Sequence, residues 1–209
     1  IECLVGSEMC IRDRNMTNLN KNDLLSLEEY SEKRELLRAE VINLKRNRLI
    51  QIGENISLLF ESVETIKYQI QEMLRIEKIF EAEGIEEELS AYNPLIPDGK
   101  NLKATMLIEY PDKEIRSEKL KDLHLIENKV WLQIGENERV IAVADEDMER
   151  SNEEKTSAVH FLRFEFDENM IEDFKNHKML YAGTDHPKYN IKTKEIAIAT
   201  IESLADDFK

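Results

Sequence analysis

Apolar side chains recur every three to four residues along two long stretches of the chain, a spacing typical of amphipathic helices. The first stretch follows a capping box, in which Ser26 caps the helix and the Glu29 side chain reaches back to it, and continues to Arg48. The second stretch runs from Ser62 to Ala82. The pattern therefore predicts a long N-terminal helix and a second long helix, joined by a segment of different period.

That joining segment, LIQIGENISLLFE over 49–61, is interrupted by Gly53-Glu54-Asn55 and predicts a β-hairpin. A second hairpin is predicted over 130–144, where the same residues QIGEN recur. Shared turn chemistry explains this recurrence better than duplication, because the similarity stops outside the hairpins. Further helices are predicted over 85–92, 113–125, 168–176 and 192–208, further strands over 103–110, 157–166 and 179–182, and loops over 145–155 and 183–190.

Helices and hairpin-linked strands thus alternate irregularly, without a glycine-rich strand–helix–strand signature. This order predicts an α+β fold with a mainly antiparallel sheet of hairpins, a long N-terminal helix, a second long helix and a C-terminal helix. Because no linker-like stretch divides the chain, we expect a single domain over 16–209.

Residues 1–15 stand apart from this pattern. The run LVGSEMCIRD at 4–13 resembles a translated sequencing adapter, and the alternative is a natural, strand-prone N-terminus. We therefore expect a non-native segment over 1–15 and a natural start at Met16, which no apolar signal-peptide core follows. The only two cysteines, Cys3 and Cys10, fall inside this segment. The remainder then has no thiolate, disulfide or cysteine-ligated iron–sulfur cluster of its own.

The charge balance narrows the function classes. The 209-residue chain carries 29 Lys and Arg against 44 Asp and Glu, a formal net charge of -15. This excess of acids argues against nucleic-acid binding, because phosphate contacts require cations. The basic residues Lys45, Arg46 and Arg48 are instead expected in the last turn of the first helix, where cations complement the helix dipole. No apolar run approaches the roughly 20 residues that a bilayer span needs. We expect a cytoplasmic protein without nucleic-acid or membrane partners.

One acidic residue falls where the helical period predicts burial. On the second long helix, Glu77 lies between Ile66 and Ile70 on the apolar arc. A buried carboxylate must be paired, hydrogen-bonded, metal-bound or protonated, because burying it alone is costly. An ion pair with a core-facing arginine or a partly exposed helix end would explain it, and a functional role is the alternative.

A similar conflict occurs on the strand over 157–166. His160 shares its face with Phe164 and other apolar residues, so we expect it in the core, either as a hydrogen-bonded core residue or as a ligand. Arg163 lies on the opposite face. It is the natural candidate to form a buried ion pair with a carboxylate such as Glu77.

A metal site built from histidines and carboxylates remains open at this point. Asp185 and His186 are adjacent in a predicted loop. A metal there would need further ligands, which the fold could bring from His160, Glu61 or Glu77. The chain has no zinc-protease or di-iron motif, no nucleotide-binding glycine loop and no nucleophile elbow. We therefore predict no catalytic residue and no cofactor, with a metal at these positions as the alternative.

Several separated motifs occur along the chain in a fixed order. They are EMLRIE at 72–77, YNPLIPDG at 92–99, Ala104-Thr105, ADED at 144–147, KTSAVHFLRF at 155–164 and Asp185-His186-Pro187. Together they resemble the uncharacterised bacterial family called domain of unknown function 3501, over about 22–209. The family has no assigned activity. The resemblance implies a gene neighbourhood shared with rubrerythrin and with an iron–sulfur oxidoreductase of the glycolate-oxidase and heterodisulfide-reductase type.

Two functions follow as hypotheses. The first is an accessory or interaction protein linked to a redox partner of the rubrerythrin and iron–sulfur oxidoreductase system. The second is a metal-binding protein or an enzyme with a site near His160, Glu77, Arg163, Asp185 and His186. A site requires these groups to meet in one cleft with shifted pKa values, whereas an accessory protein leaves them scattered or paired.

Overall fold

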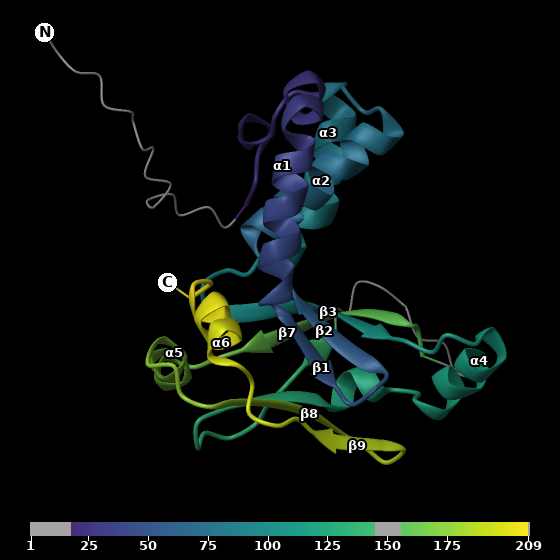
Figure 1. The fold of residues 1–209 in the computed structure, drawn as a ribbon, viewed down its shortest axis with the longest axis vertical. Coiled ribbons are helices and arrows are strands. Elements are labelled where there is room, and N and C mark those ends of the chain that lie inside the picture. Colours follow the sequence, from purple (N-terminus) through teal and green to yellow (C-terminus); the bar gives the residue numbers. More distant parts are fainter. Residues whose placement is uncertain (1–17, 145–155, 209) are drawn as a thin grey trace, which may run out of the picture.

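The computed structural model describes residues 18–144 and 156–208. Its strands form two antiparallel sheets, one above the other in Figure 1, with the orders β1-β2-β3-β7-β6 and β5-β4-β8-β9. The strands are β1 (Leu49–Ile52), β2 (Ile56–Phe60), β3 (Asn101–Ile108), β4 (Val130–Ile134), β5 (Val140–Ile141), β6 (Val143–Ala144), β7 (Val159–Glu165), β8 (Leu180–His186) and β9 (Tyr189–Lys192). The predicted α+β class with antiparallel strands is confirmed.

The helices occupy three places around the sheets. They are α1 (Leu27–Arg46), α2 (Val63–Glu77), α3 (Ala82–Tyr92), α4 (Lys113–Asp122), α5 (Glu168–Lys175) and α6 (Ile198–Ala205), with short 3-10 turns η1 (Lys21–Asp23), η2 (Asn93–Leu95) and η3 (Ile126–Lys129). Helices α1, α2 and α3 stand together above the sheets, whereas α5 and α6 flank one end and α4 the other (Figure 1). Among the helices described, none combines the length and the apolar character that a bilayer span requires.

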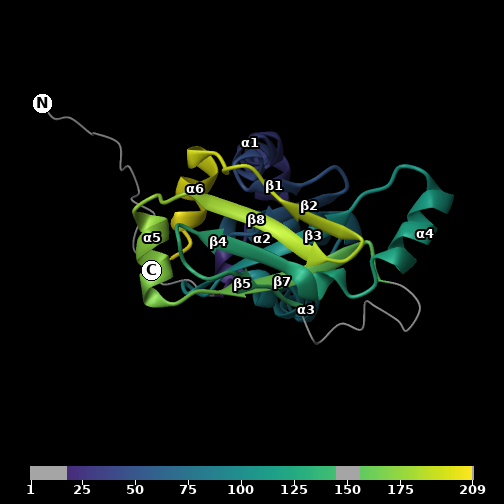
Figure 2. The same ribbon diagram turned by 90° about the horizontal axis from the view of Figure 1, so that it is seen from below.

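The inner faces of the two sheets share one apolar core. Leu102 and Met106 of β3 point into it from one sheet, and Leu132 and Ile134 of β4 reach it from the other. Figure 2 shows the four-stranded sheet from below, covering the five-stranded one. Since only Ala142 separates β5 from β6, one stretch of backbone passes from one sheet to the other and closes that side of the core.

We call α1, α2 and α3 the helical arm, which has a smaller apolar core of its own. Its buried members are Leu19, Ile66, Ile70, Leu74, Leu89 and Ile96. Between α1 and α2, Glu72 accepts hydrogen bonds from the Tyr30 hydroxyl (2.6 Å) and from two nitrogens of Arg34 (2.7 and 2.9 Å). The Arg34 guanidinium is the main cause that lowers the pKa of Glu72 to about 2. This polar contact therefore holds α1 against α2.

The predicted end of the second long helix is wrong. Helix α2 ends at Glu77 because Lys78 adopts a left-handed conformation (φ 56°, ψ 41°), and α3 begins at Ala82. The break shifts the helical phase, so the apolar arc does not extend to Phe80, which is 72 % exposed. No glycine marks this stop in the sequence.

The loop predicted over 183–190 is also wrong. Strand β8 continues to His186, and β9 begins at Tyr189, so this stretch is a hairpin. Gly183 suggested a loop, but it lies within β8 under the Trp131 ring, where a Cβ would come within 2.4 Å of a ring atom. Helix α6 is shorter than the predicted C-terminal helix. The expected non-native segment over 1–15 and the predicted loop over 145–155 lie outside the described residues.

Candidate functional site

A pocket of about 270 Å³ lies where the helical arm meets the outer face of the five-stranded sheet. Its polar lining consists of Glu61, Lys103, Thr105 and Arg163, and its apolar lining includes Leu95 of η2, Val143 of β6 and Phe161 of β7. At about 30 Å³ per molecule, this volume holds about nine waters, or an organic molecule of similar size. We call it the Glu61 pocket.

Glu61 is the buried charge of this pocket. It directly follows β2 and precedes Ser62, the N-cap of α2, and it is only 4 % exposed. Its Oε2 accepts a hydrogen bond from the Thr65 hydroxyl (2.6 Å), and its Oε1 accepts one from the Thr105 hydroxyl (3.0 Å). Within the described part of the chain, Glu61 has no ion-pair partner. Since a carboxylate offers about four acceptor positions, it retains acceptor capacity toward the cavity.

Two cations share the outer face of the sheet with Glu61. The Glu61 amide donates to the Lys103 carbonyl (2.8 Å), and Lys103 of β3 lies directly opposite Arg163 of β7. Other acceptors hold both cations, because the Lys103 ammonium donates to the Pro94 carbonyl and Arg163 pairs with Glu165. Neither forms an ion pair with Glu61, so the pocket contains separate negative and positive ends.

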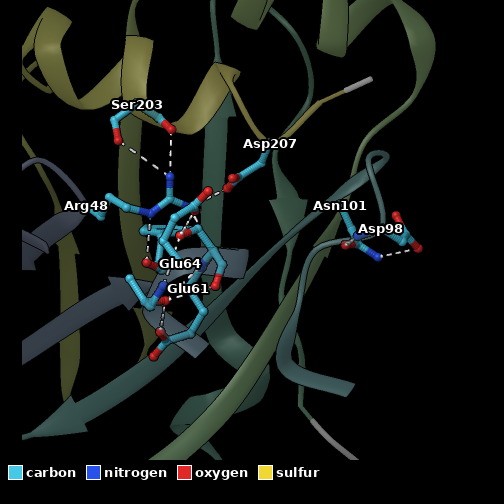
Figure 3. A network of polar contacts seen from close by, with 10 residues as sticks. Arg48, Glu61, Glu64, Asp98, Asn101, Ser203 and Asp207 are labelled. Atoms are coloured by element: carbon cyan, nitrogen blue, oxygen red, sulfur yellow. Dashed lines mark hydrogen bonds and ion pairs between the residues drawn. The ribbon is translucent and has the colours of Figure 1, made fainter. Parts of the chain in front are cut away.

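A second buried charge lies on the other side of the Glu61 backbone. Arg48, which is 1 % exposed, donates to the carbonyls of Phe60 (3.0 Å) and Glu61 (2.8 Å). Figure 3 shows it among Glu61, Ser203 and Asp207. It also donates to the Ser203 carbonyl (2.6 Å) and pairs with Asp207. Arg48 therefore ties the start of β1 and the end of β2 to the C-terminal segment. The sequence predicted Arg48 in the last turn of α1. In the structure α1 ends at Arg46, and Arg48 lies after it.

Asp207 is the acidic partner in this Arg48 cluster. Burial raises the pKa of its carboxyl to about 6, in spite of the opposing effect of the Arg48 charge. Nearby Glu64 and Asp206 raise it further. The cluster joins the start of β1 and the end of β2 to the C-terminal segment, which is a structural role.

His160 is buried, as predicted, and lies in a polar cluster inside the core. Its Nε2 contacts the Thr156 hydroxyl (2.7 Å) and the Ser157 carbonyl (3.0 Å) and lies 3.8 Å from Glu127. The Thr156 hydroxyl donates to the same Glu127 carboxylate (3.0 Å). These contacts fit an imidazole that donates through Nε2, which corresponds to a hydrogen-bonded core residue.

The adjacent residues Asp185 and His186 point to opposite faces of β8 and do not form one site. Asp185 accepts hydrogen bonds from Arg139 (2.8 Å) and from the Trp131 indole (3.1 Å), and the Arg139 guanidinium lies 4.0 Å from the centroid of that ring. His186 is buried; its Nδ1 accepts from the Lys188 amide (3.2 Å), and its Nε2 contacts the His124 carbonyl (3.1 Å). Both ring nitrogens of His186 are thus engaged by backbone.

The predicted burial of Glu77 and its ion pair with Arg163 are wrong, whereas the alternative of a partly exposed helix end agrees with the structure. Glu77 is exposed at the end of α2, because the helix stops there, whereas Arg163 pairs with its strand neighbour Glu165. The candidates Glu77, His160 and His186 therefore do not converge. In 18–144 and 156–208, no group of three or more His, Cys, Asp or Glu side chains is placed to hold a metal ion.

Sequence reasoning found only part of the pocket. It named Glu61 as a supplementary ligand and Arg163 as the partner of a buried carboxylate, and both line the pocket. It missed Lys103 and Thr105, whose strand alternation places them on the outer face and would have been the available signal.

The fold and the pocket define an α+β protein with a small, charged cavity on one sheet face. The chain belongs to the family described as protein of unknown function (DUF3501), whose model matches residues 18–208. The chain is similar to a crystal structure from Burkholderia pseudomallei K96243, described as a novel protein of unknown function. The two share 47 % identity with a TM-score of 0.87, over 92 % of this chain and 100 % of that one. Among curated proteins, none matches the chain.

Proposed function

We propose that this protein is a non-catalytic binding protein whose ligand is a small organic molecule held in the Glu61 pocket. One observation carries the proposal: Glu61, which is 4 % exposed, lines a cavity, and its carboxylate has no ion-pair partner among the described residues. Burying such a charge is costly, and a ligand that supplies a positive or hydrogen-bond-donating group offsets the cost.

The alternative of an enzyme or metal-binding protein with a site near His160, Glu77 and His186 has less support. The three groups lie in separate places, and protein atoms engage both imidazoles. The two cations that line the Glu61 pocket would also oppose a divalent cation beside Glu61. The geometry therefore favours binding of an organic ligand.

The position of the pocket fits an accessory role. Leu95 reaches it from η2 at the base of the helical arm, and the Lys103 ammonium binds the neighbouring Pro94 carbonyl. A bound ligand would contact both the arm and the sheet, so occupancy would stabilise one arrangement of the two. A protein partner that contacts the arm could respond to the ligand in this way.

The identity of that partner stays a prediction. The link to a rubrerythrin and iron–sulfur oxidoreductase system rests on the family resemblance alone, as do the redox association and the choice of a redox protein as partner. The cytoplasmic location and the absence of nucleic-acid partners are likewise predictions from composition.

Ligand-observed NMR with a library of small metabolites tests the binding function. We compare the wild-type protein with Val143→Trp, which fills the pocket from its 37 % exposed rim, and with Ile141→Trp, a matched change outside the pocket. We expect compounds that bind the wild type and Ile141→Trp but not Val143→Trp. Equal binding to all three proteins, or no binding to any, would contradict the proposal.

A further inference from the structure

The charged groups of the Glu61 pocket lie in one row across three strands. Glu61 follows β2 beside Lys103 of β3, and Lys103 lies directly opposite Arg163 of β7. With strands about 4.8 Å apart, the backbones at the two ends of this row are roughly 10 Å apart. The side chains extend over the cavity between them, so the negative and positive ends face the same space.

The juxtaposition of two cations argues for an anionic group in the ligand. Lys103 and Arg163 lie directly opposite each other on β3 and β7, so their side chains can contact the same anionic group. Arg163 uses one nitrogen for Glu165, and a guanidinium has five N–H donors. It can therefore bind a carboxylate without giving up Glu165.

The Glu61 carboxylate requires a positive group in the ligand. An anion without a positive group would be repelled by this carboxylate, and a simple amine would leave the cationic end of the pocket without a ligand. Leu95, Val143 and Phe161 line the space with apolar surface, which suits a short hydrocarbon chain between the two charges.

We infer that the ligand is an amino carboxylate, whose ammonium group binds Glu61 and whose carboxylate binds Arg163 and Lys103. This inference rests on the proposed function of the pocket and specifies the chemical class of its ligand. The volume, equal to about nine waters, suits a molecule about as large as 5-aminopentanoate.

Calorimetric titration with a matched series tests the inference. The series contains β-alanine, 4-aminobutanoate, 5-aminopentanoate and 6-aminohexanoate, together with pentylamine and pentanoate as analogues with one charge. We expect at least one amino carboxylate to bind about tenfold more tightly than either analogue. Glu61→Gln should reduce its affinity to that of pentanoate, and Arg163→Met should reduce it to that of pentylamine. Lys188→Met, which removes an exposed cation elsewhere, should change nothing.

The outcomes separate this inference from the proposed function. If pentylamine or pentanoate binds as tightly as every amino carboxylate and Val143→Trp blocks that binding, the ligand class is wrong and the pocket is still a binding site. If no compound of the series binds, the inference is overturned, and the library comparison with Val143→Trp decides the binding function independently.

Discussion

Arg48 and Glu61 are two buried charges on opposite sides of the short segment at the end of β2. They differ in the groups that surround them. Arg48 is surrounded by protein acceptors, which include the carbonyls of Phe60, Glu61 and Ser203 and the carboxylate of Asp207. Among the described residues, the Glu61 carboxylate accepts hydrogen bonds from two hydroxyls alone, and Glu61 lines a cavity. Glu61 belongs to both the Arg48 cluster and the Glu61 pocket, because its carbonyl accepts a hydrogen bond from Arg48 while its side chain lines the pocket.

The difference shows how burial of a charge relates to function. A buried charge whose hydrogen bonds all end on protein atoms holds segments together, and its removal is expected to affect stability. A buried charge that faces a cavity retains capacity for a ligand, and its removal is expected to affect binding. The following predictions test this distinction, beginning with the largest expected effect.

Arg48→Met should lower the free energy of unfolding by about 3–5 kcal/mol, because it leaves buried carbonyls without donors and Asp207 without its cation. Urea denaturation measures the change. The matched control is Arg163→Met, an exposed arginine whose loss should cost less than about 1 kcal/mol. Equal losses of stability in Arg48→Met and Arg163→Met would contradict the distinction between the Arg48 cluster and the Glu61 pocket.

The titration of Asp207 should make the free energy of unfolding depend on pH. Because burial raises its pKa from 3.8 to about 6, the folded protein retains a proton that the unfolded chain has already released over this interval. Stability relative to Asp207→Asn should therefore fall by about 2 kcal/mol as the pH rises from 4 to 6. Denaturation of both proteins at several pH values measures it. If the wild type instead became more stable relative to Asp207→Asn with rising pH, the attraction of the Arg48 charge would have a larger effect on the pKa of Asp207 than burial.

Glu72 in the helical arm is a third charge held by protein groups, and Tyr30→Phe removes one of them. Loss of this hydrogen bond should lower the free energy of unfolding by about 1.5–3 kcal/mol, the range for hydrogen bonds to charged groups. Since the pKa of Glu72 is lowered to about 2, its contribution is present above pH 4.5 and is lost as the pH falls toward 2. Tyr68→Phe is the control, and a similar loss in it would argue against the role of the hydroxyl.

Glu61→Gln should have the smallest effect on stability, below about 1 kcal/mol, because the uncompensated charge disappears while the glutamine oxygen can accept from one of the Thr65 and Thr105 hydroxyls and its NH2 group can donate to the other. A gain in stability would agree with the account. A loss as large as that of Arg48→Met would assign Glu61 a structural role instead. Thermal unfolding without added ligand distinguishes these results.

Much of the fold follows from periodicity. The capping box at Ser26, the two hairpins and the strand that carries His160 all agree with the structure, because local spacing determines them. The α2 stop at Lys78 could not be predicted, since a left-handed residue other than glycine depends on tertiary packing. The β8–β9 hairpin was missed because Gly183 is required by contact with Trp131, which is distant in sequence.

The site was less predictable than the fold. The helical period predicted Glu77 in the core on the assumption that the helix continues beyond it. Because α2 ends at Glu77, the prediction fails. Arg48 looked like a surface cation near a helix end, but its burial depends on α6 and Asp207, more than 150 residues away. The Glu61 pocket likewise combines residues from β3, β6, β7 and η2, so no local motif encodes it.

Chemical-shift mapping of the isotope-labelled protein with pocket ligands tests the central claim most directly. The account predicts that the amides of Thr105, Val143 and Arg163 shift on ligand addition, while those of Ser203 and other residues around Arg48 stay in place. Shifts centred on the Arg48 cluster, or none in the Glu61 pocket, would contradict the account.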